Sequence, residues 1–179
     1  MAWCRLHHRL YFVSEGILKK ITDTTYLTPF VGVAKFPGIQ SNSPKDFLVV
    51  LDQVNDFGNL GTIVRTAQAF GIKDFISTQE TKDLFHKKTI DASRGSVFST
   101  HLKSFSSGTE AIHYLKKAGF QIAVMTPHDS TLQSFAPIEE KPIALVLGNE
   151  THGVSQELLA AADVKIQIPM SASIESLNV

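Results

Sequence analysis

Side chains that could form a ligand site gather in three short stretches of the sequence, and each stretch follows a segment with strand character. Asn59 and Arg65 lie in the first stretch, Glu150 in the second, and Ser176 and Asn178 in the third. Together they offer a cation, an anion and neutral hydrogen-bonding groups. Because the ligands of open parallel sheets sit outside the carboxyl ends of the strands, the sequence predicts that the three stretches meet at one edge of a sheet.

Each of these residues also has a simpler structural explanation. Asn59 is suited to cap a helix, Arg65 can be a solvated helix residue, and Glu150 can be a carboxylate on a surface loop. Ser176 and Asn178 are common turn formers. Each stretch alone is a weak signal, and it is their occurrence at three strand ends that favours a site.

The stretch around Arg65 is predicted to be a buried strand, a turn and a helix. Residues 48–51 form a short continuous apolar run, which is typical of a strand covered on both faces. Asn59 is placed to cap a helix that begins near Leu60. Arg65 is expected to lie off the buried face of this helix, with its side chain over the end of the strand. The buried face itself is predicted to consist of Ile63, Ala67 and Phe70.

The rest of the chain alternates between strand and helix signals, which indicates an α/β fold with a parallel sheet and helices on both faces. Ser107 and Glu110 have the spacing of a capping box, and Gly119 is suited to end the helix that they open. Ser155 is placed to cap a later helix that extends through Ala162. Further strands are expected at residues 31–36, 73–77, 97–102, 121–125, 143–147 and 164–168, and a further helix at residues 82–92.

The composition is that of an ordinary globular protein. The 179 residues, 43% of them hydrophobic and 19% charged, suffice for one domain and a small appendage. Seventeen basic and 17 acidic side chains cancel, so the overall charge gives no argument for nucleic acid binding. The single cysteine fits a reducing compartment, and we expect a cytoplasmic protein. The basic residues 1–13 lack a long apolar segment and are interpreted as part of the protein, with a transit peptide as the alternative.

Several classes of site are disfavoured by the sequence. The spacing of Gly58 and Gly61 does not match the G-x-G-x-x-G fingerprint of dinucleotide binding, and there is no phosphate-binding G-x-x-x-x-G-K-[ST] loop. No G-x-S-x-G motif supports a hydrolase. His7 and His8 are adjacent, which is poor spacing for a shared metal, so no metal site is expected. No apolar run approaches the roughly 20 residues of a membrane helix, so no membrane partner is expected either.

Three motifs resemble those of the SpoU/TrmH family, which are RNA ribose 2′-O-methyltransferases of the SPOUT class. The first is N-x-G-x-x-x-R, with Asn59, Gly61 and Arg65. The second is LVLGNE-x-x-G at residues 145–153, and the third is IPM followed by SLNV at residues 168–179. The segment ASRGSVF, residues 92–98, resembles a further patch common in the family. The resemblance extends over residues 48–179.

The resemblance implies a fold, a cofactor and an assembly. The expected fold is a parallel sheet that ends in a trefoil knot, and the expected assembly is a homodimer that acts on rRNA or tRNA. The expected cofactor is S-adenosylmethionine, bound through backbone groups in an apolar setting. The residues that the resemblance assigns to the cofactor are Thr126, Leu147, Gly148, Ile168, Met170 and Leu177. Asn59, Arg65, Glu150, Ser176 and Asn178 are assigned to the RNA side.

The implied reaction is in-line transfer of a methyl group to a ribose 2′-hydroxyl, which requires alignment and removal of a proton. In the mechanism proposed for the family, the arginine of the first motif is the general base, and the corresponding residue here is Arg65. A guanidinium with a pKa above about 12 gives up its proton reluctantly, and holding a substrate phosphate is an easier role for it. Ser176 and Asn178 could orient the hydroxyl or the cofactor, and Glu150 could fix either Arg65 or neighbouring amides.

The resemblance also predicts the domain organisation. Residues 1–45 resemble the end of a small RNA-binding domain followed by a linker, and residues 46–179 resemble the catalytic domain. Family members continue beyond the position of Val179 into a helix, so we expect a shortened catalytic domain. Phe57 replaces a usual proline and Ala172 a usual glycine, which would be strained if that position needs a positive φ. The alternative to an active enzyme is therefore a non-catalytic RNA-binding member of the same fold.

Overall fold

The computed structural model describes residues 5–7, 10–22, 25–26, 28–33, 46–78, 81, 83–126 and 141–168. The chain divides into two compact units, Met1–Phe36 and Pro37–Val179. All of the candidate site residues belong to the second unit.

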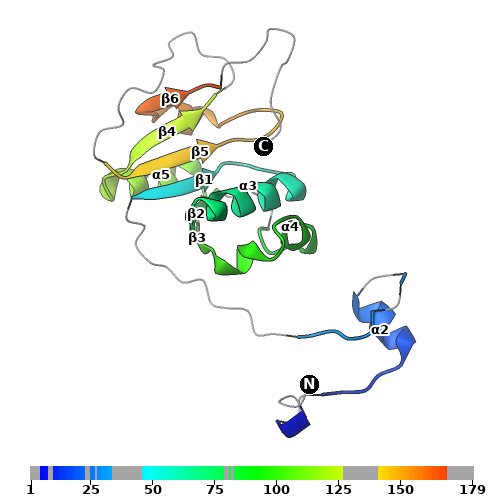
Figure 1. Cartoon of the computed structure of the whole chain (residues 1–179). Helices are drawn as coiled ribbons and strands as arrows, with labels where there is room; N and C mark the ends of the chain where they lie inside the picture. Colours follow the sequence, from blue (N-terminus) through cyan, green and yellow to red (C-terminus); the bar gives the residue numbers. More distant parts are fainter. Residues whose placement is uncertain are drawn as a thin grey trace. The chain divides into compact units, whose positions relative to one another are not determined.

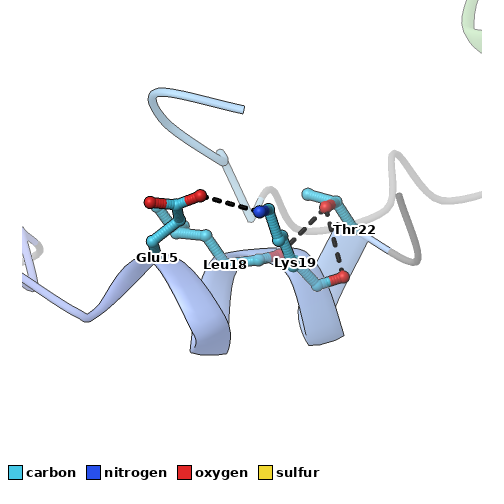
Figure 2. A network of polar contacts seen from close by, with 4 residues as sticks. All are labelled: Glu15, Leu18, Lys19 and Thr22. Atoms are coloured by element: carbon cyan, nitrogen blue, oxygen red, sulfur yellow. Dashed lines mark hydrogen bonds and ion pairs between the residues drawn. The ribbon is translucent and has the colours of Figure 1, made fainter. Parts of the chain in front are cut away.

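The described part of the first unit contains the helix α2 (Glu15–Thr22). An ion pair of 2.7 Å joins Lys19 Nζ to Glu15 Oε1 one turn away, and Thr22 Oγ1 donates to the carbonyl oxygen of Leu18 at 2.9 Å (Figure 2). The strand predicted at residues 31–36 is absent from 31–33, and residues 34–36 lie outside the described residues. Within its described residues, this unit therefore contributes short helical segments and no strand.

In its described residues, the second unit is built on a parallel sheet whose six strands have the order β3-β2-β1-β5-β4-β6 (Figure 1). The strands are β1 (Phe47–Leu51), β2 (Asp74–Ser77), β3 (His101–Ser104), β4 (Gln121–Met125), β5 (Ile143–Leu147) and β6 (Val164–Ile166). The five pairings among these strands are all parallel, as the sequence predicted.

Between β1 and β5 the path of the chain across the sheet changes direction, since β2 and β3 lie on one side and β4 and β6 on the other. β1 pairs with β2 on one side and with β5 on the other, and Leu51 is in register with Leu147. The carboxyl ends of β1 and β5 therefore lie side by side. In open α/β sheets the crevice beyond such a switch point is the usual ligand site, and here the first two predicted stretches follow these strands.

Helices cover both faces of the sheet, which confirms the prediction. The helices are α3 (Phe57–Ala69), α4 (Lys87–Ala92), the 3₁₀ helix η1 (Ser96–Ser99), α5 (Gly108–Lys117) and α6 (Gln156–Ala160). Successive residues of β1 point to opposite faces. Leu48 and Val50 pack in one cluster with α5 and α6, whereas Val49 and Leu51 pack in a second cluster with α3 and η1. The knot expected from the resemblance involves the carboxyl-terminal stretch, which from residue 169 lies outside the described residues.

The segment between β2 and β3 differs from the prediction. Of the helix predicted at residues 82–92, the described residues from 83 on form only α4, which His86 caps through a hydrogen bond from Lys88 N to His86 Nδ1 of 3.2 Å. The strand predicted at residues 97–102 is instead η1 followed by β3, which begins at His101. Gly95 has a φ of +80° and redirects the chain, and Val97 is fully buried beside α3. The apolar character of Val97 thus reflects packing of a helical turn rather than of a strand.

The buried face of α3 was predicted correctly at Ile63 and Ala67 and wrongly at Phe70. Phe70 is 79% exposed, because α3 ends at Ala69 and Phe70 is its C-cap residue. Gly71, with a φ of +80°, then reverses the chain, and Ile72 N donates to the carbonyl oxygen of Ala67 at 2.9 Å. Ile72 packs against the α3 side of the core in place of Phe70.

The later helices follow their predicted signals more closely. Ser107 is the N-cap of α5 and accepts from Glu110 N at 3.2 Å, and Gly119 follows the helix with a φ of +81°. Ser155 is the N-cap residue of α6, although its hydroxyl makes no capping bond, and α6 ends at Ala160 rather than at Ala162. The strand predicted to end at Ile168 ends at Ile166.

Candidate active site

The helix that carries Arg65 begins earlier than the sequence indicated. α3 starts at Phe57, and its N-cap is Asp56, whose Oδ1 accepts from Asn59 N at 2.8 Å. The prediction that Asn59 is the cap is therefore wrong. Asn59 lies in the first turn of α3, where its amide is free to reach across the switch point.

Glu150 joins the stretch after β5 to the start of α3. Its Oε1 accepts from Asn59 Nδ2 at 3.1 Å and from Asp56 N at 3.3 Å, and its Oε2 accepts from Asn55 N at 3.4 Å. Of the two roles predicted for Glu150, the structure shows the one in which it fixes neighbouring amides. No ion pair joins it to Arg65 within the described residues. The first and second stretches thus meet at the carboxyl edge, as predicted.

The hydrogen bonds that Glu150 accepts favour the ionised form of its carboxyl group. Partial burial raises the pKa of this carboxyl, but the hydrogen bonds from Asn59 and from the backbone N–H groups, including those of Asn55 and Asp56, outweigh burial and lower the pKa below its ordinary value of 4.5. The carboxylate also lies at the amino-terminal end of α3, where the helix dipole favours a negative charge. Glu150 is therefore a fixed anion at neutral pH and a poor general base.

Replacing Glu150 with glutamine should make the free energy of unfolding change less between neutral and acid pH. Because the folded pKa of Glu150 is lowered, its contribution is fully present above 4.5 and is lost as the pH falls through the folded value. We expect Glu150→Gln to destabilise the protein by about 0.5–1 kcal/mol at neutral pH, a value discounted for solvent screening. Urea unfolding at neutral pH and near pH 3 should show this difference shrinking in acid. A difference that does not change with pH would contradict the assignment.

A second network fixes the backbone directly after β1. Asp52 is 1% exposed, and its two oxygens accept from Thr78 Oγ1 at 3.0 Å and from Ser155 N at 2.7 Å. Gln53 has a φ of +58°, and its N–H donates to Thr78 Oγ1 at 3.1 Å. Asn149 Nδ2 donates to the carbonyl oxygen of Gln53 at 2.9 Å. These bonds hold a strained residue next to the site and tie together the loops that follow β1, β2 and β5.

Sequence reasoning missed Asp52 and Thr78. The one local signal was a carboxylate directly after a continuous apolar strand, since an acidic residue is almost never buried without partners. The partners themselves are 26 and 103 residues away along the chain, so only the fold reveals them.

The loop after β5 is held in a tight turn. Asn149 and Gly153 exchange backbone hydrogen bonds of 2.8 and 2.9 Å, and Asn149 Oδ1 accepts from Thr151 N and His152 N. A Cβ atom at Gly148 would lie 2.4 Å from the backbone of Gly153 and Val154, so a side chain at this position would displace the turn. This turn gives Glu150 a defined position.

The residues assigned to the cofactor follow three neighbouring strands. Thr126 comes directly after β4, Gly148 directly after β5, and Ile168 two residues after β6. Leu147 is the last residue of β5, and Ile168 is 51% exposed. Since the three strands are parallel and adjacent, these positions share the carboxyl edge of the sheet. Met170 and Leu177 lie outside the described residues.

This strand-end lining fits S-adenosylmethionine. It combines exposed apolar surface at Ile168 with backbone groups and has no ionised side chain of its own, which suits a neutral adenosine. Among the residues that the structure describes, no group of three His, Cys, Asp or Glu side chains could hold a metal ion. No described helix is long and apolar enough to cross a membrane.

Arg65 is exposed on α3, off the buried face, as predicted. The third predicted stretch, with Ser176 and Asn178, lies outside the described residues, so its arrival at the same edge stays a prediction.

Comparison with known proteins identifies the family. Residues 46–179 match the model of the SpoU rRNA Methylase family. The chain is 32% identical over 174 residues to the 23S rRNA (guanosine(2553)-2′-O)-methyltransferase RlmP of Bacillus subtilis, covering 94% of this chain and 67% of that protein. The crystal structure of an rRNA methyltransferase from Sinorhizobium meliloti superimposes with a TM-score of 0.78 at 31% identity, over 92% of this chain and 64% of that one. The AdoMet-bound structure of an rRNA methyltransferase from the same organism gives a TM-score of 0.71 at 29% identity, with the same coverage.

The similarity covers most of this chain but only part of each relative. The chain spans about two thirds of the length of the relatives above and 47% of a tRNA/rRNA methyltransferase of Mycobacterium tuberculosis. The match includes all three motif stretches. The described part of the structure has the predicted parallel sheet, and the Asn59–Glu150 hydrogen bond joins the first two stretches. The chain belongs to the SpoU rRNA methylase family.

Proposed function

We propose that this chain methylates a ribose 2′-hydroxyl in rRNA or tRNA with S-adenosylmethionine as the methyl donor. The observation that carries the proposal is the Glu150 carboxylate, which fixes Asn59 and the start of the Arg65 helix beside the strand ends suited to the cofactor. The B. subtilis relative is named for a 23S rRNA guanosine, and one of the similar structures contains AdoMet. Both support the assignment.

We assign one set of residues to binding the cofactor and another to binding the RNA. When bound, S-adenosylmethionine would supply a methyl group whose carbon an oxygen nucleophile can attack, with the sulfonium sulfur leaving as a neutral thioether. Thr126, Leu147, Gly148 and Ile168 would hold it, together with Met170 and Leu177. Its neutral part would lie on the apolar strand ends.

On the RNA side, Arg65 is a permanent cation, and we assign it to holding a phosphate so that the ribose hydroxyl is aligned for attack. Glu150 positions Asn59 and the start of α3 rather than accepting the proton, because its lowered pKa makes it a weak base. Ser176 and Asn178 are assigned to orienting the hydroxyl, whose proton passes to solvent water as its oxygen takes the methyl group. We further propose that the active form is a homodimer.

A methyl-transfer assay tests the proposal. The 179-residue chain would be incubated with S-adenosylmethionine carrying a labelled methyl group and with unmodified transcripts of rRNA and tRNA. Label should enter RNA and remain in dinucleotides after alkaline hydrolysis, because the 2′-oxygen is the nucleophile of alkaline cleavage and methylation blocks it. RNA binding without transfer, together with no heat from cofactor at millimolar concentration in calorimetry, would favour the non-catalytic RNA-binding alternative.

A further inference from the structure

Arg94 occupies a backbone position that favours glycine. It follows the C-cap of α4, Ser93, and has a φ of +53°. The bonds around it are those of a Schellman motif, with Arg94 N donating to Asp91 O at 3.2 Å and Gly95 N donating to Ile90 O at 3.0 Å. Glycine is the usual residue at the left-handed position of this motif, because a Cβ atom is unfavourable there. An arginine at this left-handed position therefore points to a role outside the fold itself.

Contacts between α3 and the segment 92–96 bring the backbone on both sides of Arg94 against the helix that carries Arg65. Gly61 of α3 approaches Ser93 so closely that a Cβ atom on it would lie 2.8 Å from Ser93 N. Gln68, two turns further along α3, donates through Nε2 to the carbonyl oxygen of Ser96 at 2.7 Å. Arg65 lies on the same stripe of α3 between Gly61 and Gln68. Arg94 lies between Ser93 and Ser96, so the two arginines lie along the same line of contact.

Both guanidinium groups are available to a ligand. Arg65 and Arg94 are exposed, and neither forms an ion pair with a described residue. The nearby Asp91, on α4, contributes its carbonyl oxygen to Arg94 N but no carboxylate contact. Two exposed arginines along one line of contact, neither of them paired with a described carboxylate, can form a site for an anion with several acceptor oxygens.

We propose that Arg94 is a second RNA-binding residue, which holds the same backbone phosphate as Arg65. The proposal rests on the proposed function, since it takes RNA as the ligand of this edge. A guanidinium donates two parallel hydrogen bonds to phosphate oxygens, and contacts of this kind fix the register of a nucleic acid without reading its sequence. Arg94 thereby positions the ribose that Arg65 presents to the methyl donor.

The variant Arg94→Gly separates this role from a structural one. Glycine removes the guanidinium and also relieves the left-handed backbone, so the unfolding midpoint should rise by about 2–4 °C. Affinity for a fluorescein-labelled RNA hairpin should nevertheless fall by about tenfold, and the salt dependence of binding should lose roughly one unit of slope. A merely structural residue would not weaken binding while the protein becomes more stable. Arg94→Lys, which keeps the charge, should retain part of the affinity, and Lys117→Ala on α5 should change neither quantity.

A double-mutant cycle tests the shared phosphate. Arg65→Ala together with Arg94→Gly should bind the hairpin little more weakly than Arg65→Ala alone, because the two residues act on one group. Additive losses would overturn the shared phosphate. Unchanged binding in Arg94→Gly, with methyl transfer by the parent chain intact, would overturn the role of Arg94 and leave the proposed function standing. A parent chain that binds no RNA would overturn both.

Discussion

Replacing Arg65 with alanine should slow methyl transfer by a factor of about 10²–10³ and leave the fold intact. Removing a charge-assisted contact that aligns the reacting groups costs about 3–4 kcal/mol of transition-state stabilisation, which corresponds to this factor. Because Arg65 is exposed and makes no contact that supports the core, the stability should change by less than about 0.5 kcal/mol. Single-turnover methylation with saturating RNA measures the rate, and urea unfolding measures the stability.

Arg65→Lys distinguishes a phosphate-binding role from the role of a general base. Lysine keeps a cation but loses the two parallel donors, so we expect an intermediate rate with an unchanged pH profile. If Arg65 removed the proton, the lysine variant would move the pH dependence of the rate because its own pKa is lower. Lys117→Ala, an exposed cation on the opposite face of the sheet, is the matched control and should transfer methyl groups normally. A wild-type rate in Arg65→Ala would remove Arg65 from the mechanism.

The sequence predicts that the first two stretches of the site meet, because the carboxyl ends of parallel strands lie at the same edge of a sheet. Residues 48–51 and 143–147 are continuous apolar runs, so both are predicted to be strands, and parallel neighbours bring the residues after them to one edge. The meeting of Asn59 and Glu150 required no knowledge of side-chain geometry. It required only that the two strands be adjacent and parallel.

The start of α3 could not be predicted because the sequence offers two good capping residues three positions apart. Asp56 and Asn59 have similar intrinsic preference for the N-cap. The tertiary structure decides between them, since Glu150 accepts from the N–H groups of Asn55 and Asp56 and thereby holds the chain for a helix that begins at Phe57. Phe70 was misassigned for a related reason, because a periodic pattern cannot tell where Gly71 ends the helix.

Replacing Asp52 with alanine should have the largest effect on stability. The variant leaves Ser155 N and the Thr78 hydroxyl without their acceptor at a site that is 1% exposed, and we expect a loss of about 2–5 kcal/mol in the free energy of unfolding. Such a loss is a large part of the total stability of a domain of this size. Urea unfolding followed by circular dichroism measures it.

Asp52→Asn is the matched control, because it conserves the shape of the side chain. Its remaining oxygen can accept from Ser155 N, and its amide can donate to Thr78 Oγ1, so that chiefly the hydrogen of the Thr78 hydroxyl loses a partner. We therefore expect Asp52→Asn to be destabilised by less than half as much as Asp52→Ala. Thr78→Val should fall between the parent chain and Asp52→Ala, since it removes the acceptor of Gln53 N while Ser155 N keeps its carboxylate. An Asp52→Ala variant within about 0.5 kcal/mol of the parent chain would show that this carboxylate does not hold the three loops together.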